Sequence, residues 1–220
     1  MKEHKSISIA DQIFEQLEHD ILIGKYQRGE ILTELKLSET LGVSRTPIRE
    51  AIRRLEQEHI IEETSRGAVV IGISKEDLFD MYEIRMHLEG LAAARTARNI
   101  TDDGLSKMKE VLDLQRYYVD KTDADNSDNS DNIKNLDSEF HRLLYIFSGS
   151  KAYYDTLLPI HKKMIKYRKA SMKSHSRARQ SLNEHEGIYH ALEHHDPELA
   201  QKLTIEHATR ARDSILEKEI

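Results

Sequence analysis

Apolar side chains recur every three or four residues along most of this chain, which is the spacing of helices with one buried face. The first such run follows Ser8 and Asp11, whose positions fit a capping box, and it should end near Gly24. A short second helix is expected from Leu35 to Leu41. The pattern therefore predicts a protein built mainly from helices.

The stretch from Gly42 to Glu58 predicts a tight turn followed by a helix with two different faces. Ser44 or Thr46 can cap this helix, with Pro47 in its first turn. The core-facing positions are Ile48, Ala51, Ile52 and Leu55. The basic positions on another face are Arg45, Arg49 and Arg53, with Arg54 beside them. Such a helix is typical of the recognition helix of a helix-turn-helix, and the alternative is an arginine-rich surface helix.

Two short β-prone runs, 60–63 and 68–71, flank the turn at 64–67 and predict a hairpin. Three helices and a small β-hairpin make a winged helix. The tip of that hairpin would present Arg66 and Gly67 to a phosphate backbone or a minor groove. Taken alone, Arg66 is equally well explained as a solvated turn residue.

The helical pattern continues without a repeat, so we expect a winged helix-turn-helix domain over 1–72 and an all-helical bundle over 73–220. The helices expected in the bundle are 75–98, 102–119, 134–148, 152–174, 178–195 and 197–218. The acidic stretch 120–132 faintly resembles a calcium loop, but Asp128 stands where such a loop needs Gly and Lys134 where it needs Glu. We interpret this stretch as a solvated loop.

The composition agrees with a mainly helical protein of one large or two small domains, because 33% of the 220 residues are charged and only three are Pro. The absence of Cys excludes disulfides and thiolate metal sites and favours a reducing compartment. No apolar run approaches membrane-spanning length, and the N-terminus has no signal-peptide pattern. We therefore expect a cytoplasmic protein that does not enter a membrane.

The net charge of −6 argues against a general nucleic-acid binder. Residues 1–72 hold ten Lys and Arg against thirteen Asp and Glu. The segment from Arg45 to Arg54, however, carries four Arg and the single acidic residue Glu50. We therefore expect a local positive field, salt-dependent affinity and a specific DNA site.

Four polar side chains in the second half occupy helix positions that should face the core. Asp137 and His141 are one turn apart and share a face, and His185 and His207 lie in core-spaced runs of two further helices. Burial of a carboxylate and three imidazoles is costly unless something satisfies them, and a divalent metal ion would do so. This ligand set suits Zn²⁺ best, with Ni²⁺, Co²⁺, Fe²⁺ or Mn²⁺ as alternatives. Each His taken alone is more often a satisfied core histidine.

Arg85 also falls on an inward-facing stripe, and a guanidinium there needs a carboxylate partner. That partner can be internal, such as Glu89 or Glu110, or it can belong to a bound ligand. The remaining histidines considered do not join the metal pattern, and we interpret them as surface or helix-end residues: His87, His161, His175, His190, His194 and His195.

Over nearly its whole length the sequence resembles the GntR family of bacterial transcription regulators, in the FadR-like branch whose effector domain is the all-helical FCD type. The N-terminal hallmark runs from Gly29 to Ala51. The resemblance implies that the recognition helix and wing contact DNA through Ser44, Arg45, Thr46, Arg49, Arg66 and Gly67. Many relatives carry an Arg at the position of Leu35, and the neighbouring Lys36 is the candidate for that contact here.

The C-terminal hallmark is Asp137 and His141 within a Phe-His-Arg-Leu-Leu context, followed by His185 and His207. The resemblance implies that these four residues hold the ion, as they do in metal-binding members of the family. It also implies that Arg85 lies in a ligand pocket and that small organic acids are the usual effectors.

These observations predict a ligand-responsive transcription regulator, not an enzyme, that binds palindromic operator DNA as a homodimer. In such a dimer two recognition helices about 34–36 Å apart read one turn of DNA. One rival is a metalloregulator whose effector is the metal itself, and another is a purely structural metal site. A third, a helical metallohydrolase fused to a DNA-binding module, lacks a nucleophile motif or a second carboxylate beside the predicted metal.

Overall fold

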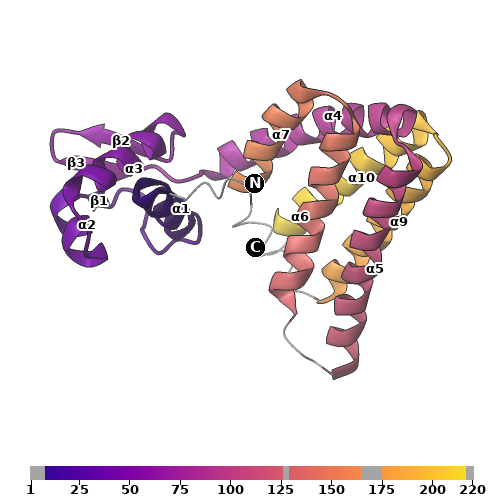
Figure 1. Cartoon of the computed structure of the whole chain (residues 1–220), viewed down its shortest axis with the longest axis horizontal. Helices are drawn as coiled ribbons and strands as arrows, with labels where there is room; N and C mark the ends of the chain where they lie inside the picture. The colour runs from indigo at the N-terminus through magenta and orange to yellow at the C-terminus, as the bar shows by residue number, and fades with distance from the viewer. Residues whose placement is uncertain (1–7, 126–128, 165–174, 217–220) are drawn as a thin grey trace, which may run out of the picture. The chain divides into compact units, whose positions relative to one another are not determined.

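The computed structural model describes residues 8–125, 129–164 and 175–216. The chain divides into two compact units, Met1–Ser74 and Lys75–Ile220, and each is described by itself (Figure 1). The fold is mainly α, as the sequence predicts. In the described part of the chain, no helix is both long enough and apolar enough to span a bilayer.

The first unit combines three helices with a small antiparallel sheet whose strand order is β1-β3-β2. Its elements are α1 (Ile9–Leu22), β1 (Ile31–Leu32), α2 (Glu34–Leu41), α3 (Arg45–Gln57), β2 (Ile61–Thr64) and β3 (Gly67–Val70). The predicted capping box is confirmed, since the Ser8 hydroxyl accepts from the Asp11 N–H while the Asp11 side chain accepts from the Ser8 N–H. The apolar faces of the three helices share one core with the sheet.

The turn between α2 and α3 follows from Gly42, which takes the left-handed conformation with φ of 66° and ends α2. Ser44 is the N-cap of α3, as expected, but its side chain makes no capping hydrogen bond. The predicted core-facing positions of α3 are confirmed, because the buried side chains are Ile48, Ala51, Ile52 and Leu55. The opposite face of the helix is therefore left to solvent.

Strand β1 is absent from the sequence prediction, because two residues are too few to show an alternating pattern. It pairs with β3 and places Ile31 opposite Val69. Gly67 opens β3 with φ of 129°, and a Cβ atom there would lie 2.8 Å from the carbonyl oxygen of Leu32. Glycine is therefore required at this position both by backbone conformation and by the close approach of β1.

The described part of the second unit is all helical. Its helices are α4 (Lys75–Asn99), α5 (Asp102–Asp125), α6 (Ser130–Phe147), α7 (Lys151–Lys163), α9 (His175–Glu193) and α10 (Pro197–Leu216). Helix α4 packs most extensively against α10 and also touches α6, α7 and α9. The core of this unit is built from small and branched residues such as Ala93, Leu144 and Leu192.

Two predicted boundaries in this unit are wrong. The acidic stretch 120–132 is mostly helical, because α5 continues to Asp125 and α6 begins at Ser130. Tertiary packing of the inward residues Val119 and Ile133 overrides the weak helix propensity of Asp, Asn and Ser here. The helix expected over 152–174 ends at Lys163, and residues 165–174 lie outside the described part of the chain.

Candidate metal centre and DNA-binding helix

Three buried histidines converge from three helices of the second unit. His141 comes from α6, His185 from α9 and His207 from α10, and each is at most 2% exposed. One ring nitrogen of each can be chosen so that all three atoms lie within 4.8 Å of one another. The ring centroids are 4.6 to 5.2 Å apart. Three residues spread over 66 positions of the sequence, from His141 to His207, are thus brought to one point in the core.

Asp137 lies beside this group without belonging to the compact set of three. It is one turn before His141 on α6 and is 2% exposed. Its Oδ1 atom lies 3.6 Å from Nε2 of His185 and accepts a hydrogen bond of 3.1 Å from the Ser181 hydroxyl. The four predicted ligand positions are therefore brought together, with the carboxylate on the α9 side.

Two of the histidines have a carboxylate on Nδ1. Glu89 of α4 lies 3.0 Å from Nδ1 of His141, and Glu184 of α9 lies 2.8 Å from Nδ1 of His207. A carboxylate that accepts from Nδ1–H fixes the tautomer, so the lone pair is on Nε2. Carboxylate–histidine pairs of this kind orient the ligands of metal sites in many proteins.

The electrostatic surroundings keep these rings neutral. Burial lowers the pKa of His141, although the Glu89 carboxylate opposes the shift. Burial, together with the positive Arg85 and Arg177, lowers the pKa of His207 well below its usual range. Metal binding needs an unprotonated ring nitrogen, and the site supplies it without a proton-release cost at neutral pH. The donor set therefore fits a divalent ion with affinity for imidazole.

Arg85 points into the bundle and is 1% exposed. Of the two internal partners considered, Glu89 is the one it contacts, with 2.7 Å between Nε and Oε2. Glu110 lies on the exposed face of α5. The Nη2 atom of Arg85 also lies 2.9 Å from Nε2 of His141. The guanidinium therefore adjoins the histidine group directly.

Glu89 joins these groups into one buried network. Its Oε1 atom accepts a hydrogen bond from the Tyr145 hydroxyl, and its other oxygen accepts from Arg85. Burial alone would raise the pKa of Glu89, but Arg85 and His141 hold that pKa well below its usual range. The network thus contains the negative charge of Glu89 and the positive charge of Arg85 beside the imidazole rings.

His161 lies in the last turn of α7, as a helix-end residue, but it is not a surface residue and it adjoins the histidine group from which the sequence interpretation excluded it. It is only 3% exposed, and its ring centroid lies 5.1 Å from that of His141. Burial and the neighbouring His141 and Arg85 lower its pKa well below the usual value. The apolar spacing of Leu157, His161 and Met164 on α7 was the signal that could have revealed it.

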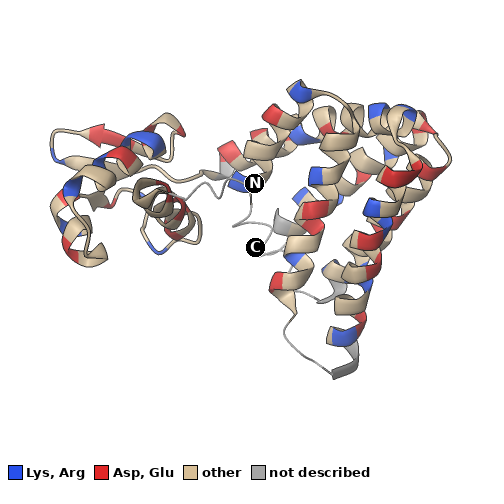
Figure 2. Ribbon diagram, viewed as in Figure 1, with Lys and Arg blue, Asp and Glu red and all other residues tan. Residues whose placement is uncertain are grey.

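The predicted DNA-binding residues gather on α2, α3 and the wing of the first unit. The exposed members are Lys36, Ser44, Arg45, Thr46, Arg49 and Arg66, and Gly67 is half-buried. Arg54 is different, because its guanidinium lies 4.0 Å from the Phe14 ring centroid and pairs with Asp11. It holds α3 against α1. Lys and Arg are mixed with Asp and Glu along the helices of both units, so the basic positions of α3 are a local feature (Figure 2).

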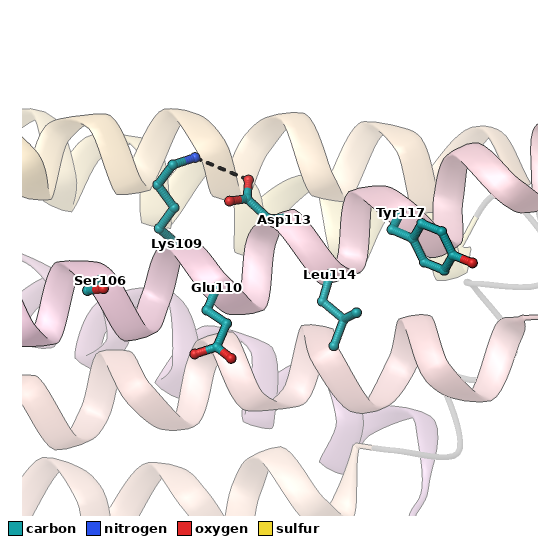
Figure 3. A pocket seen from close by; sticks show the side chains of 6 residues that line it. All are labelled: Ser106, Lys109, Glu110, Asp113, Leu114 and Tyr117. Carbon is teal, nitrogen blue, oxygen red and sulfur yellow. Dashed lines mark hydrogen bonds and ion pairs between the residues drawn. The ribbon is translucent and has the colours of Figure 1, made fainter.

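A separate groove of about 630 Å³ lies along the outer face of α5. Its lining residues all come from that helix and are Ser106, Lys109, Glu110, Asp113, Leu114 and Tyr117 (Figure 3). The Lys109 ammonium pairs with Asp113 at 3.1 Å. None of these residues belongs to the histidine group, so the groove is a feature of the surface and not of the metal centre.

A helix-turn-helix with a wing, followed by a separate helical unit with a buried histidine cluster, is the architecture of a regulator of transcription. Comparison with known families agrees with this class. The family described as bacterial regulatory proteins, gntR family, matches residues 9–71, and the FCD domain matches residues 80–210. The chain therefore belongs to the GntR family of transcription regulators and carries an FCD domain.

The relatives are also regulators of transcription. The repressor RspR of Escherichia coli is 26% identical over 208 residues, which cover 94% of this chain and 89% of that protein. The gluconate operon repressor of Bacillus licheniformis is 34% identical over 110 residues, which are 50% of this chain and only 45% of that protein. The solved structure of E. coli McbR/YncC has a TM-score of 0.77 at 22% identity and covers 98% of this chain and all of that one, which shows a shared fold.

Proposed function

We propose that this GntR-family regulator senses a small carboxylate through a metal-containing site in its FCD domain. In this proposal Asp137, His141, His185 and His207 hold a divalent ion. Arg85 binds the carboxylate of the effector, and the occupied site alters operator binding by the first unit. The observation that carries the proposal is the convergence of three buried histidines beside a buried guanidinium.

The guanidinium supports an anionic effector. Nε of Arg85 donates a hydrogen bond to Glu89, and Nη2 of Arg85 contacts His141 of the histidine group. A planar fork at this place can bind a carboxylate that also reaches the ion. Because the chain is similar to a gluconate operon repressor, we choose a hydroxy acid as the first effector to be tested.

Zinc is the ion that we propose first. Three imidazoles and one carboxylate are common zinc ligands, and Ni²⁺, Co²⁺, Fe²⁺ and Mn²⁺ also accept this set. The ion would supply a positive centre with coordination positions open to effector oxygens. The effector changes DNA binding only to the extent that it binds two arrangements of the domain with different affinity.

For DNA, we propose contacts from Lys36, Ser44, Arg45, Thr46, Arg49, Arg66 and Gly67. Operators of helix-turn-helix dimers are palindromic because the two recognition helices are related by a two-fold axis. We therefore propose a homodimer, and exposed apolar side chains such as Leu91, Leu114 and Tyr117 are available for an interface. Relatives named as repressors support regulation of an operon by direct operator binding.

The effector proposal is tested with Arg85→Lys, which keeps the charge beside Glu89 but removes the planar fork. Metal content by elemental analysis should stay unchanged, while the concentration of gluconate, or of another small hydroxy acid, needed to shift operator binding rises at least about tenfold. Arg95→Lys, at an exposed position of the same helix, is the control. An unchanged response in Arg85→Lys, or no response of wild-type protein to any acid, would contradict the proposal.

A metalloregulator is the second candidate, and one contact favours it. Nε2 of His141 has a hydrogen-bond partner in Arg85, which a bound ion would have to displace, and this competition lowers the affinity for the ion. A sensor of the metal itself needs such a limit on affinity, because its signal must dissociate. Dialysis against a chelator distinguishes the two. If the folded protein loses its ion reversibly and operator binding follows the ion alone, the metal is the effector.

A further inference from the structure

One carboxylate in the first unit holds two of the arginines assigned to DNA. Oε1 of Glu34 accepts from Nε of Arg49 at 2.7 Å, and Oε2 accepts from Nη2 of Arg49 at 2.8 Å. The same Oε2 atom accepts from Nε and Nη2 of Arg45, at 3.1 and 2.8 Å. Four charge-assisted hydrogen bonds therefore converge on a single side chain.

The fold places these residues together through the caps of two helices. Thr33 caps α2 and makes Glu34 its first residue, and Ser44 caps α3 and makes Arg45 its first residue. Arg49 lies one turn later on the same face of α3. The αL turn at Gly42 brings the two helix starts to one side of the motif. The juxtaposition is therefore a product of the helix-turn-helix itself.

The electrostatic effect on Glu34 is large for a surface group. Hydrogen bonds from Arg49 and Arg45 lower the pKa of Glu34 to about 2, although its partial burial opposes the shift. The carboxylate is therefore ionised at neutral pH. It also neutralises part of the positive field that the arginine spacing on α3 predicts.

A negative charge at this place has two consequences for DNA binding. It repels phosphates, and it occupies guanidinium donors that would otherwise bind any phosphate within reach. It also restricts the arginine side chains before DNA is bound. They therefore lose less rotamer freedom on binding a base than unrestricted arginine side chains would lose. Both effects disfavour binding to DNA in general more than binding to one matched sequence.

We propose that Glu34 is a positioning residue that sets Arg45 and Arg49 for base reading and reduces binding to non-cognate DNA. The proposal rests on the assignment of α3 as the DNA-reading helix. The base that the positioned arginines would read is guanine, since its paired acceptors O6 and N7 match an arginine fork. Operator specificity then depends on a residue of α2 as well as on the recognition helix.

The test uses full-length Glu34→Gln and, as matched control, Glu39→Gln. Glu39 is an exposed residue of the same helix that forms no ion pair or hydrogen bond within the described chain. The probes are the duplex that wild-type protein selects from a randomised pool and a shuffled duplex of the same composition. For Glu34→Gln we expect tighter binding to the shuffled duplex and a specificity ratio about tenfold lower. For the shuffled duplex we also compare the slope of the logarithm of the binding constant against the logarithm of the salt concentration. In Glu34→Gln this slope should be steeper by about one unit than in Glu39→Gln.

A second variant distinguishes a loss of the carboxylate contacts from a general effect of substitution on folding. Glu34→Asp retains the charge but is one methylene shorter, so it cannot hold both arginines, and its specificity ratio should fall between those of wild type and Glu34→Gln. If Glu34→Gln keeps the wild-type ratio and salt slope, the proposal is wrong. If Arg45→Ala with Arg49→Ala also binds like wild type, the assignment of α3 fails as well, and the two failures are thereby distinguished.

Discussion

At the scale of the residue, carboxylates determine what the functional side chains of both units can do. Glu89 and Glu184 fix the tautomers of two histidines, and Glu34 holds two arginines. Glu34 and Glu184 do not stand out in the sequence, because a glutamate in a helix is ordinary, and Glu89 was predicted only as one possible partner of Arg85. Their roles depend on contacts that only the folded chain makes.

Removal of a carboxylate from a histidine should weaken metal binding. Glu184→Gln replaces the charged acceptor at Nδ1 of His207 with a neutral amide, and we expect about a 10- to 100-fold loss of metal affinity in a chelator competition titration. Glu186→Gln, on the same helix as Glu184, is the control, because it breaks an ion pair with Arg116 of α5 that involves no histidine. Equal metal affinity in the two variants would contradict the orienting role of Glu184.

A buried amide offers a separate residue-scale prediction. Gln115 is fully buried on α5, and neither of its amide atoms has a hydrogen-bond partner among the described residues. Gln115→Met should therefore raise the free energy of unfolding by roughly 1–2 kcal/mol in urea titrations. Gln180→Met, at an exposed position, should leave it unchanged. A loss of stability in Gln115→Met would mean that a bound water or ligand satisfies the amide.

At the scale of the element, α3 divides its arginines between structure and recognition. Arg45 and Arg49 face the carboxylate of α2, whereas Arg54 packs on α1. The sequence spacing placed Arg45, Arg49 and Arg53 on one face and Arg54 beside it, which agrees with this division. The sequence could not show that Glu34 and Asp11 would be their partners.

Substitution of the two neighbouring arginines separates these roles. Arg54→Ala loses the cation–π contact with Phe14, which is worth roughly 0.5–1 kcal/mol, and should lower the unfolding midpoint of the first unit. Arg53→Ala, at an exposed position, should leave that midpoint unchanged and reduce the salt dependence of DNA binding. The measurements are urea unfolding and binding titrations at several salt concentrations. The opposite pattern would mean that Arg54, not Arg53, faces DNA.

At the scale of the whole molecule, the two candidate functional sites lie in different compact units. The first holds the candidate DNA-binding residues and the second holds the histidine group. The family assignment applies to both, since the two family matches cover residues 9–71 and 80–210. The proposed regulation requires the units to communicate, and the oligomer to present two recognition helices.

Metal removal should act on one unit only. A ligand that binds the folded state alone stabilises it, so a chelator should lower the unfolding temperature of the second unit. The first unit, which has no histidine group among its described residues, should unfold as before. Calorimetry with and without chelator measures this, and His141→Ala should reproduce the effect without chelator. A downward shift of both transitions would contradict the confinement of the ion to the FCD domain.

The proposed dimer is checked by native mass. We expect twice the 25.5 kDa of one chain in native mass spectrometry, both with and without operator DNA. Leu91→Glu and Leu114→Glu place a charge on the exposed faces of α4 and α5. If one of these variants is found as a monomer, the helix that carries the substituted residue contributes to the dimer interface. A monomer at micromolar concentration of wild-type protein would contradict the homodimer.

The sequence by itself determined most of the helices, though not their bounds around 120–132 or the end of α7, together with the recognition-helix pattern and the inward placement of Asp137, His141, His185, His207 and Arg85. These follow from periodicity, which is a local property of the chain. Only the tertiary structure decided which carboxylate meets which cation or ring, that His161 is buried, and that β1 completes the sheet. The physical reason is that such contacts join residues far apart in sequence, and their distances are set by how the helices pack.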